Sequence, residues 1–527
     1  MSNIKLIESF TPKLPRLVRD YLGGKPEARA LVQYSPDLNG LKSVALSRSG
    51  KNVNRQVLVD VLIEQAKASN YSSERSLAQI ERLRSEDVFT VTTGHQLCIY
   101  GGPLFFFYKI LSAVKLTEQL SQQGIHSVPI YWMASEDHDF EEINHIWLKG
   151  RKIEWRTEAI GAVGELKCSS MLWFKDEVKA ELKDDHRYVD VLKDLDLIYS
   201  SDKTLAEATR DLVYRVFAET GLVVLDANDH RLKTLFGEFV ETEIKEHFSS
   251  EALAITNTDL ETLGYDRQVT GREINLFWME ENYRSRIVQQ SMQLFSTADG
   301  LREWTRDELL SQVDSNPQHF SPNVILRPLY QEVILPNIAY IGGPGELSYW
   351  LQLKGVFESA KVNMPVVLLR DMFLITDEVA QRKMTQLGLN YADLQRSFDQ
   401  VLDTLLRSLG THEAIVESKA KIIEHELDSM MIELEKIYPG LRESADSEKT
   451  RILKRLEALR KKVFRADRQG GDVTRDRLEF IFQRTFPNGI PQERISNWMD
   501  FFFDFDKLLQ ILSICDPLEN KLRIIQQ

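Results

Sequence analysis

The chain has few cysteines for its 527 residues, and no two of them are close in sequence. Cys98, Cys168 and Cys515 form no CxxC pair, so the sequence provides neither a disulfide framework nor a cysteine-based zinc finger. The N-terminus lacks the apolar core of a signal peptide, and no apolar run is long enough to span a bilayer. We therefore expect a cytoplasmic protein that does not bind membranes.

Positive charge is scarce as well. The formal net charge of -13 argues against a nucleic-acid groove, because such grooves need an excess of lysine and arginine. A local basic site stays compatible with this balance, since net charge describes the whole surface and not one cleft. With 43% hydrophobic and 28% charged residues the composition is that of a globular protein, and the length predicts several structural units.

Apolar, strand-like runs alternate with helical patterns along much of the chain. The runs "DVFTVTTG" and "SVPIYWMAS" flank a helix expected from Pro103 to Gln122, and "GLVVLDAND" and "MPVVLLRDMFLI" supply further strands. Strand, helix and strand over this length form a βαβ unit, which favours a parallel sheet. The pattern predicts an α/β core in three parts, 76–150, 204–230 and 321–376, interrupted by inserts at 151–203 and 231–320.

The remaining segments differ from this core. Residues 1–75 predict an N-terminal arm, and the amphipathic tail 501–527 predicts a helix that packs on the core. Between 377 and 500, apolar residues recur at spacings of four and three, which predicts an antiparallel coiled coil of two helices. "YPGLRESADS" is expected to join these helices and "RQGGDVTRD" to end the second. The apolar positions are Ile423, Leu427, Met430, Leu434 and Ile437, then Ile452, Leu456, Leu459 and Val463.

Two short stretches resemble each other. "YGGPLFFFY" and "IGGPGELSY" share Gly-Gly-Pro and a tyrosine six residues after the second glycine, and both follow a strand and open a helix. In one interpretation, backbone amides at these helix starts bind an anion, beside contacts from the preceding "TGHQ". In the other, the turns only start helices. The residues concerned are Gly94, His95, Gln96, Gly101, Gly102, Gly342 and Gly343.

The stretch "EDHDFEEINH" places five acidic residues and two histidines between Glu136 and His145, directly after an apolar strand. Ligands of open α/β sheets bind at the carboxyl ends of strands, so this cluster predicts a site that holds Mg²⁺, acts as a base or binds an amine. Capping of the next helix by Asp137 or Asp139 explains one carboxylate, but not His138 between two aspartates. Zinc is not expected, because the histidines match no zinc signature.

Two arginines stand at the ends of strand candidates, Arg327 in "VILRPLYQE" and Arg370 in "VVLLRDMFL". An arginine at such an edge can bind a carboxylate or phosphate through two hydrogen bonds, or can pair with a structural aspartate. Glu346 falls in the first turn after Gly343-Pro344, where it either faces a ligand or complements the helix dipole.

With these motifs, the sequence resembles the cysteine-adding enzymes of bacillithiol biosynthesis, a family of cysteine ligases. The resemblance rests on "TGHQLCIYGGPLFFFYK", "YWMASEDHDFEEINH", "SPNVILRPLYQEVILPNIAYIGGPGE" and the late coiled coil, and it spans nearly the whole chain. It implies a Rossmann-like core, two connecting-peptide inserts, a coiled-coil domain and a homodimer. It also implies that L-cysteine is joined to glucosaminyl-malate.

Amide formation from a free carboxylate is uphill in water, so this reaction implies activation by ATP with Mg²⁺. We expect the two helix starts, with Arg327 or Arg370, to bind carboxylate or phosphates. Asp137, His138 and Asp139 are expected to position a metal or to accept the amine proton. The family commonly has "TGQQ" where this chain has "TGHQ", so the resemblance supports Gly94 and Gln96 better than His95.

Two other functions fit the sequence. One is an ATP-dependent amino-acid ligase or nucleotidyl transferase with another acceptor, because the acceptor pocket cannot be recognised in one sequence. The other is a non-enzymatic scaffold that recruits partners through its coiled coil. The polar cluster at a strand end argues against the scaffold, since a core without a reaction has no need of it.

Overall fold

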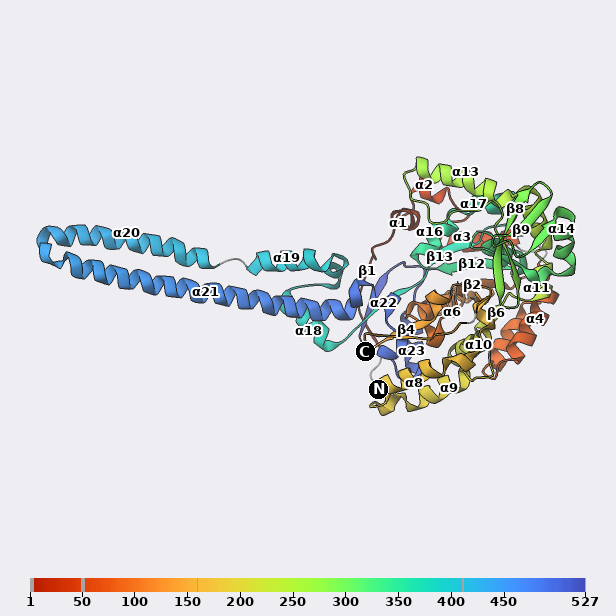
Figure 1. The fold of residues 1–527 in the computed structure, drawn as a ribbon, viewed down its shortest axis with the longest axis horizontal. Helices are drawn as coiled ribbons and strands as arrows, with labels where there is room; N and C mark the ends of the chain where they lie inside the picture. The colour runs from red at the N-terminus through yellow and green to blue at the C-terminus, as the bar shows by residue number, and fades with distance from the viewer. Residues whose placement is uncertain (1–3, 49–52, 159, 410–411, 527) are drawn as a thin grey trace. The chain divides into compact units, whose positions relative to one another are not determined.

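The computed structural model describes residues 4–48, 53–158, 160–409 and 412–526, and the chain divides into two compact units (Figure 1). The first unit comprises residues 1–375 and 491–527, and the second comprises residues 376–490. No helix in the described ranges combines the length and the apolar character that a membrane span requires.

A five-stranded sheet forms the centre of the first unit, with all neighbouring strands parallel. β2 is the earliest of the five in the chain and lies in the middle, with the later strands added on both sides of it. Every residue of β3 and β12 is buried, as expected for a parallel sheet covered on both faces. The predicted α/β fold with a parallel sheet is confirmed. In sheet order the strands are β13 (Val366–Leu369), β12 (Asn337–Gly342), β2 (Phe89–His95), β3 (Ser127–Met133) and β6 (Val223–Asp226).

Helices from distant parts of the chain cover the sheet. α6 (Phe105–Gln122) packs on β2, β3 and β12, and α10 (Leu205–Phe217) packs on β6. The sequence predicts an arm over residues 1–75, but α3 (Leu38–Arg48) packs on β12 and β13, and α4 (Arg55–Lys67) packs on β6. The apolar faces of these two helices need a partner, and the sheet provides it.

The second insert contains its own five-stranded sheet, in the order β10-β9-β8-β7-β11 and antiparallel throughout. A tight turn at Glu281 and Asn282 connects β7 to β8, and Asn282 adopts a positive φ of 56°. The strands are β7 (Leu276–Glu280), β8 (Tyr283–Ser291), β9 (Leu294–Thr297), β10 (Glu303–Thr305) and β11 (Phe320–Pro322). The first insert is mainly helical, with α8 (Leu172–Leu182) and α9 (Val189–Ile198) after the hairpin of β4 (His145–Leu148) and β5 (Arg151–Glu154).

The C-terminal tail belongs to the first unit from residue 491 onwards, and it is not the single helix expected over 501–527. It contains the short helices α22 (Gln492–Ile495) and α23 (Phe505–Leu509), and it ends in β15 (Leu522–Gln526). β15 lies between β1 (Lys5–Phe10) and β14 (Met372–Thr376), so the two ends of the chain share a sheet. Residues 522–526 form a strand because their main chain pairs with β1. The spacing of apolar residues in the sequence does not reveal this pairing.

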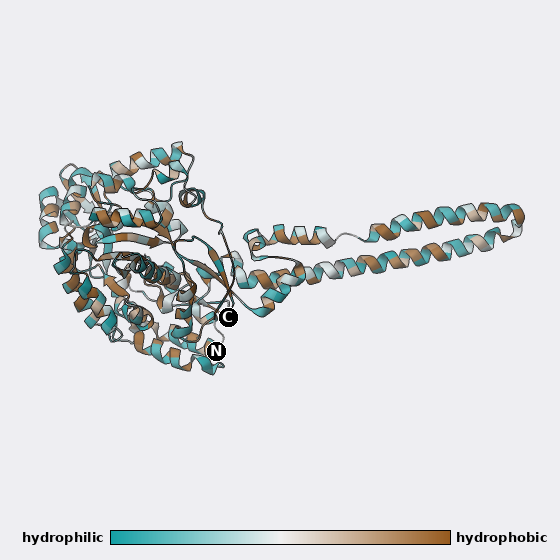
Figure 2. Cartoon of the chain, turned by 180° about the vertical axis from the view of Figure 1, so that it is seen from behind, coloured by the Kyte–Doolittle hydropathy of each residue, from teal (hydrophilic) through white to brown (hydrophobic). Residues whose placement is uncertain are grey.

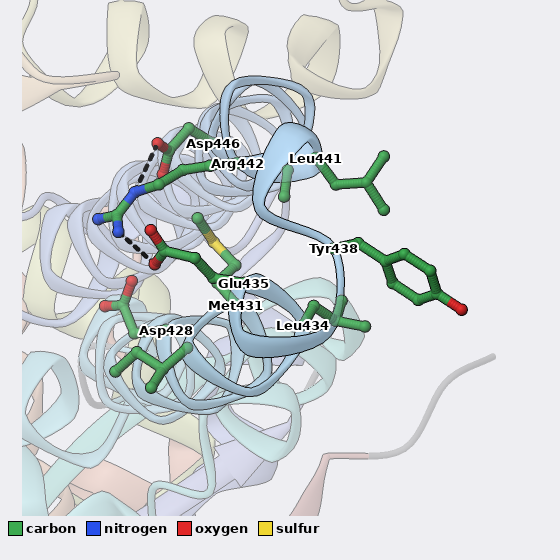
Figure 3. Close-up of a pocket in the computed structure, with 10 residues that line it drawn as sticks. Asp428, Met431, Leu434, Glu435, Tyr438, Leu441, Arg442 and Asp446 are labelled. Carbon is green, nitrogen blue, oxygen red and sulfur yellow. Dashed lines mark hydrogen bonds and ion pairs between the residues drawn. The ribbon is translucent and has the colours of Figure 1, made fainter.

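The second unit contains the helical hairpin of α20 (Glu413–Ile437) and α21 (Arg442–Thr485), along which hydrophobic and hydrophilic residues alternate (Figure 2). At its tip the Arg442 guanidinium forms ion pairs with Glu435 and Asp446, while Tyr438 points away from them (Figure 3). The second helix was expected to end at "RQGGDVTRD", but α21 continues through it. Packing of α21 on α18 (Glu378–Leu387) and α19 (Phe398–Leu409) outweighs the weak helix propensity of two glycines.

Candidate active site

A cavity of about 440 Å³ opens at the carboxyl edge of the central sheet. β2, β3 and β12 end there, on both sides of the point where the order of strands reverses. Open α/β sheets bind their ligands at this place, because the chain leaves adjacent strands in opposite directions. The cavity brings together these residues named from the sequence: Gly94, His95, Gln96, Glu136, Asp137, His138, Arg327 and Glu346.

The end of β2 supplies His95 and Gln96. The Nδ1 atom of His95 lies 3.0 Å from the Gln96 carbonyl oxygen, and its ring packs against the rings of Phe105 and Phe106. Burial lowers the pKa of His95 to about 3, and the charge of Lys109 contributes, so the imidazole is neutral at physiological pH. Neutral His95 is thus a packing residue at the rim of the site.

The acidic stretch after β3 faces the cavity through Asp137. Its Oδ2 atom accepts a hydrogen bond from Gln96 Nε2 at 2.8 Å, and its Oδ1 atom accepts the His138 backbone N–H at 2.8 Å. Burial acts to raise the pKa of Asp137, but the neighbouring His138 side chain, these hydrogen bonds and the Arg284 guanidinium hold it well below its usual range. Asp137 is therefore a carboxylate at neutral pH. Glu136 forms an ion pair with the buried Lys233.

A buried ion pair connects β2 to the helix after β12, α16 (Pro344–Trp350). Lys109 of α6 donates to Glu346 at 2.7 Å and to the carbonyl oxygen of Gly94. Glu346 also accepts the Tyr340 hydroxyl at 2.6 Å and the Gly343 N–H at 2.9 Å. Burial opposes ionisation of Glu346, but Lys109 and these donors lower its pKa to about 2. The Lys109–Glu346 ion pair therefore holds the end of β2 close to the start of α16.

Arg327 is the first residue of α15 (Arg327–Ile334) and not the end of a strand as the sequence suggested. Asn323 accepts the N–H of Ile325 at 2.8 Å, which turns the chain into a helix start. The Arg327 guanidinium donates to Gln331 at 3.1 Å and lies 5.6 Å from the centre of the Trp132 ring. Its Nη2 atom is buried and has no protein acceptor among the described residues.

Three further arginines of the cavity come from the second insert, and the sequence analysis did not identify them. Arg284 and Arg286 point to one face of β8, since alternate residues of a strand share a face, and Arg272 lies just before β7. The alternating "YRSRIV" was the available signal, but nothing in the sequence places β8 over the core. Within the described residues, Arg272 and Arg286 have no carboxylate partner.

The cavity therefore carries more free positive than free negative charge, although the whole chain is acidic. Glu136 and Glu346 are neutralised by Lys233 and Lys109, whereas the arginines Arg272, Arg286 and Arg327 have no ion-pair partner among the described residues. Guanidinium groups bind carboxylates and phosphates through paired hydrogen bonds. The arrangement is suited to an anionic ligand, with Asp137 available for a cationic group.

Comparisons with known proteins agree with this fold. Residues 2–371 match the family described as bacillithiol biosynthesis BshC, N-terminal Rossmann-like domain, and residues 373–527 match its C-terminal coiled-coil domain. The chain belongs to the BshC family. Relatives named "Putative cysteine ligase BshC" occur in Flavobacterium johnsoniae (34% identity over 97% of each chain) and Cytophaga hutchinsonii (37% identity over 95% of each chain).

The first Gly-Gly-Pro turn of this BshC-family chain does not face the cavity. Gly101 and Gly102 have φ values of 76° and 51°, and both are buried. The Gly102 N–H donates to the Ile99 carbonyl at 2.9 Å, and Asn497 donates to the Gly102 carbonyl at 2.8 Å. The anion contact expected at this turn stays a prediction, and the structure places the Gly102 backbone groups in hydrogen bonds within the chain.

At the second Gly-Gly-Pro turn, too, backbone groups form hydrogen bonds within the chain. Glu346 accepts the Gly343 N–H, and the Arg370 backbone N–H donates to the Gly342 carbonyl, so neither glycine lines the cavity. Arg370 is 3% exposed and forms a two-fold ion pair with Glu493 at 2.6 and 2.8 Å. The structure therefore gives Arg370 a structural partner in the C-terminal tail.

Four members of the acidic cluster lie outside the cavity, namely Asp139, Glu141, Glu142 and His145. Asp139 caps the short helix α7 (Phe140–Ile143) by accepting the Glu142 N–H at 3.3 Å, which matches the capping interpretation. His145 starts β4, where it pairs with Glu154 of β5. Within the described residues no group of three histidine, cysteine or acidic side chains is placed to hold a metal ion.

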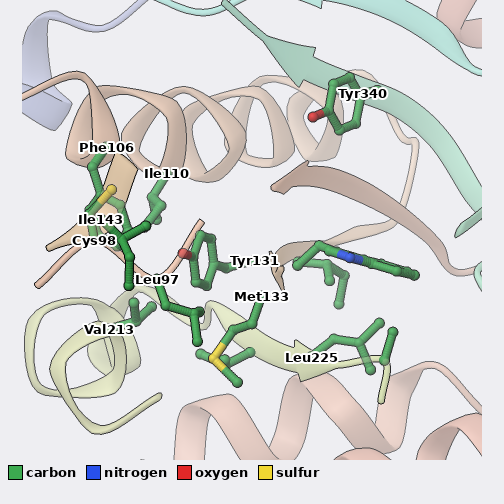
Figure 4. Close-up of a cluster of buried hydrophobic side chains, with 14 of the residues drawn as sticks. Leu97, Cys98, Phe106, Ile110, Tyr131, Met133, Ile143, Val213, Leu225 and Tyr340 are labelled. Carbon is green, nitrogen blue, oxygen red and sulfur yellow. The ribbon is translucent and has the colours of Figure 1, made fainter. Parts of the chain in front are cut away.

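A dense apolar cluster supports the cavity from behind. Leu97, Phe106, Ile110, Met133 and Leu225 belong to the same buried cluster as Tyr131 of β3 (Figure 4). Cys98 belongs to this cluster, and burial raises the pKa of its thiol to about 12. A thiol of this kind is not a nucleophile at neutral pH, so Cys98 is a packing residue here.

Proposed function

We propose that the protein joins L-cysteine to glucosaminyl-malate through an amide bond, the last step of bacillithiol biosynthesis. The observation that carries this proposal is the arginine-lined cavity at the strand-order reversal in a BshC-family chain. The malyl group is anionic, and the cavity has free guanidinium groups for it. The name that the relatives carry, cysteine ligase, supports the class of reaction.

The proposed reaction needs an activated carboxylate and a neutral amine. ATP supplies the activation as a co-substrate, and either an acyl phosphate or an acyl adenylate meets the need. A neutral amine of one substrate then attacks the activated carbonyl carbon of the other, and the C–N bond forms. The bond between that carbon and the oxygen bridging to phosphorus breaks, phosphate or AMP leaves, and the amine proton passes to water or to the departing group. Arg272, Arg286 and Arg327 hold the substrate carboxylate and the phosphates in position for this attack.

Asp137 is proposed to bind the ammonium group of cysteine and so to position this substrate in the cavity. Its low pKa makes it a weak base, so binding suits it better than proton removal. Gln96 holds the carboxylate in place through the 2.8 Å hydrogen bond. This role differs from that of a metal ligand, since the donor set does not fit a metal held by the protein alone. We propose that Mg²⁺ enters on the nucleotide.

The test is a ligation assay with purified protein, glucosaminyl-malate, cysteine and ATP, in which mass spectrometry detects the thiol product. We expect product with the wild-type protein and a loss of about 100-fold in kcat/KM with Asp137→Asn, whose folding is checked by circular dichroism. Full activity of a folded Asp137→Asn or Asp137→Ala variant would overturn the role of Asp137. Turnover of another acceptor, with none of glucosaminyl-malate, would overturn the substrate.

We also propose that the protein is a cytoplasmic homodimer that associates through the second unit. α20 exposes apolar side chains that a monomer leaves in water, among them Ile415, Ile422 and Ile432. Light scattering coupled to size-exclusion chromatography is expected to give twice the chain mass of 60.9 kDa. A monomeric mass at micromolar concentration would contradict this assembly.

A further inference from the structure

The second insert reaches the acidic cluster through Lys233, which pairs with Glu136, and through Arg284, which lies beside Asp137 and His138. Arg284 of β8 places its Nη1 atom 2.6 Å from the Nδ1 atom of His138. The guanidinium also donates to Ser321 Oγ at 3.2 and 3.3 Å, and it lies 3.9 Å from the centre of the Phe277 ring. Only 6% of the Arg284 side chain is exposed, so its position is fixed by the insert.

This contact determines where His138 carries its proton. A guanidinium group has only donors and stays protonated in proteins, so Nδ1 of His138 must be the acceptor. A neutral imidazole with a bare Nδ1 carries its hydrogen on Nε2. A second proton on Nδ1 would displace the Arg284 contact.

Asp137 does not change this assignment. Its Oδ1 atom lies 3.6 Å from His138 Nδ1, beyond hydrogen-bonding distance, and accepts the His138 backbone N–H instead. In catalytic triads, by contrast, an aspartate accepts the Nδ1 hydrogen and leaves Nε2 free as the base. Arg284 thus imposes the opposite orientation of the imidazole hydrogens.

We propose that Arg284 is a positioning residue that holds His138 as the neutral tautomer with hydrogen on Nε2. His138 then donates a hydrogen bond to the oxygen on which negative charge develops during ligation, and it does not take the proton of the attacking amine. That proton leaves to water or with the departing phosphate group. The identity of the oxygen rests on the proposed function, whereas the tautomer does not.

The tautomer is tested by ¹⁵N NMR of the full-length protein with labelled histidine, and the His138 signal is assigned by its absence in His138→Gln. We expect an unprotonated Nδ1 and a protonated Nε2 in the wild type. Arg284→Met should give a mixture of tautomers, while Arg286→Met, two residues along β8 and without a His138 contact, should not. A protonated Nδ1 in the wild type would overturn the proposal.

The role is tested by two substitutions at His138. Glutamine places an N–H near the position of Nε2, and asparagine places one near Nδ1. We expect His138→Gln to keep kcat within about tenfold of wild type and His138→Asn to lose about 100-fold, as when an oxyanion donor is removed. A folded glutamine variant as inactive as His138→Ala would show that His138 is the base. If the wild type ligates nothing, the proposed function fails, and the NMR result still decides the tautomer.

Discussion

The two Gly-Gly-Pro turns share a motif but differ in their surroundings, because only the second contributes to the cavity. At the first turn, Tyr100, Gly101 and Gly102 all have positive φ, and their backbone is enclosed by α6 and the C-terminal tail. At the second turn, Gly343 is extended with φ -79° and ψ 173°, and Glu346 folds back onto its N–H. Only the second turn places a side chain in the cavity wall.

This difference shows that the motif alone specifies a helix start and not a ligand. The sign of φ decides which way the amides point, and the neighbouring chain decides which of them are free. In the first turn a β-carbon at Gly101 or Gly102 would lie 2.5 Å from another side chain, so close packing requires both glycines. In the second turn the charge of Glu346, paired with Lys109, is the feature that the site uses.

The largest expected effect is on folding, from a methyl group in the first turn. Gly102→Ala combines a positive φ with a clash against Cys98, so we expect a loss of about 3 kcal/mol in the free energy of unfolding. Gly345→Ala in the second turn meets no atom within 4 Å and should change it by less than about 1 kcal/mol. Urea unfolding followed by tryptophan fluorescence measures both, because all 8 tryptophans lie in the first unit. Equal free energies of unfolding for Gly102→Ala and Gly345→Ala would contradict the difference between the two turns.

The next effect is on activity, from the charge in the second turn. Glu346→Gln leaves buried Lys109 without its partner, and we expect about 100-fold lower kcat/KM and a loss of about 2 kcal/mol in stability. The double variant Lys109→Met/Glu346→Gln should recover stability but not activity, because the buried charge is gone while the cavity wall stays altered. The ligation assay and urea unfolding check both arms. A fully active single variant would show that the second turn, like the first, only builds the fold.

The same contrast separates the two arginines named from the sequence. Arg327→Met should raise KM for glucosaminyl-malate by about tenfold with little change in kcat, because it removes a binding contact in the cavity. Arg370→Met should instead lower stability, since it leaves Glu493 buried without a partner. Steady-state kinetics measures KM and urea unfolding measures stability, and both are applied to both variants. A raised KM for Arg370→Met at unchanged stability would restore Arg370 to the site.

The smallest expected effect at neutral pH is at His95, the neutral packing residue at the end of β2. Its pKa falls from 6.5 to about 3 on folding, so below pH 6.5 the unfolded chain binds a proton that the folded chain refuses. Stability therefore decreases as the pH falls from 6.5 towards 3, by at most about 1.4 kcal/mol per pH unit. His95→Gln should remove this component and leave ligation at neutral pH within about threefold of wild type. An unchanged pH dependence of urea unfolding would contradict the burial of a neutral His95.

Much of the core was predictable from the sequence, since buried parallel strands are nearly continuous apolar runs. "SVPIYWMAS" and "DVFTVTTG" match β3 and β2 to within a few residues, and the polar cluster after β3 lies at the cavity as expected. Such strands also predict where their carboxyl ends meet. Asp137, His138 and Gln96 follow from that rule.

The rest depends on contacts between distant segments. Arg284 reaches His138 only because the antiparallel sheet of the second insert is placed at this edge, and no local pattern encodes that placement. Arg370 pairs with Glu493 across 123 residues, so its role could not be separated from that of Arg327 beforehand. Gly470 and Gly471 stay helical because α21 packs on neighbouring helices, which overrides local propensity.

The most direct test of the central claim is a crystal structure of the protein with glucosaminyl-malate and a nucleotide bound. The account predicts the malyl carboxylates against the arginines of the cavity, beside Gln96 and Asp137, and no ligand at Gly101 or Gly102. Density for both ligands elsewhere, with an empty cavity at the ends of β2 and β12, would contradict it.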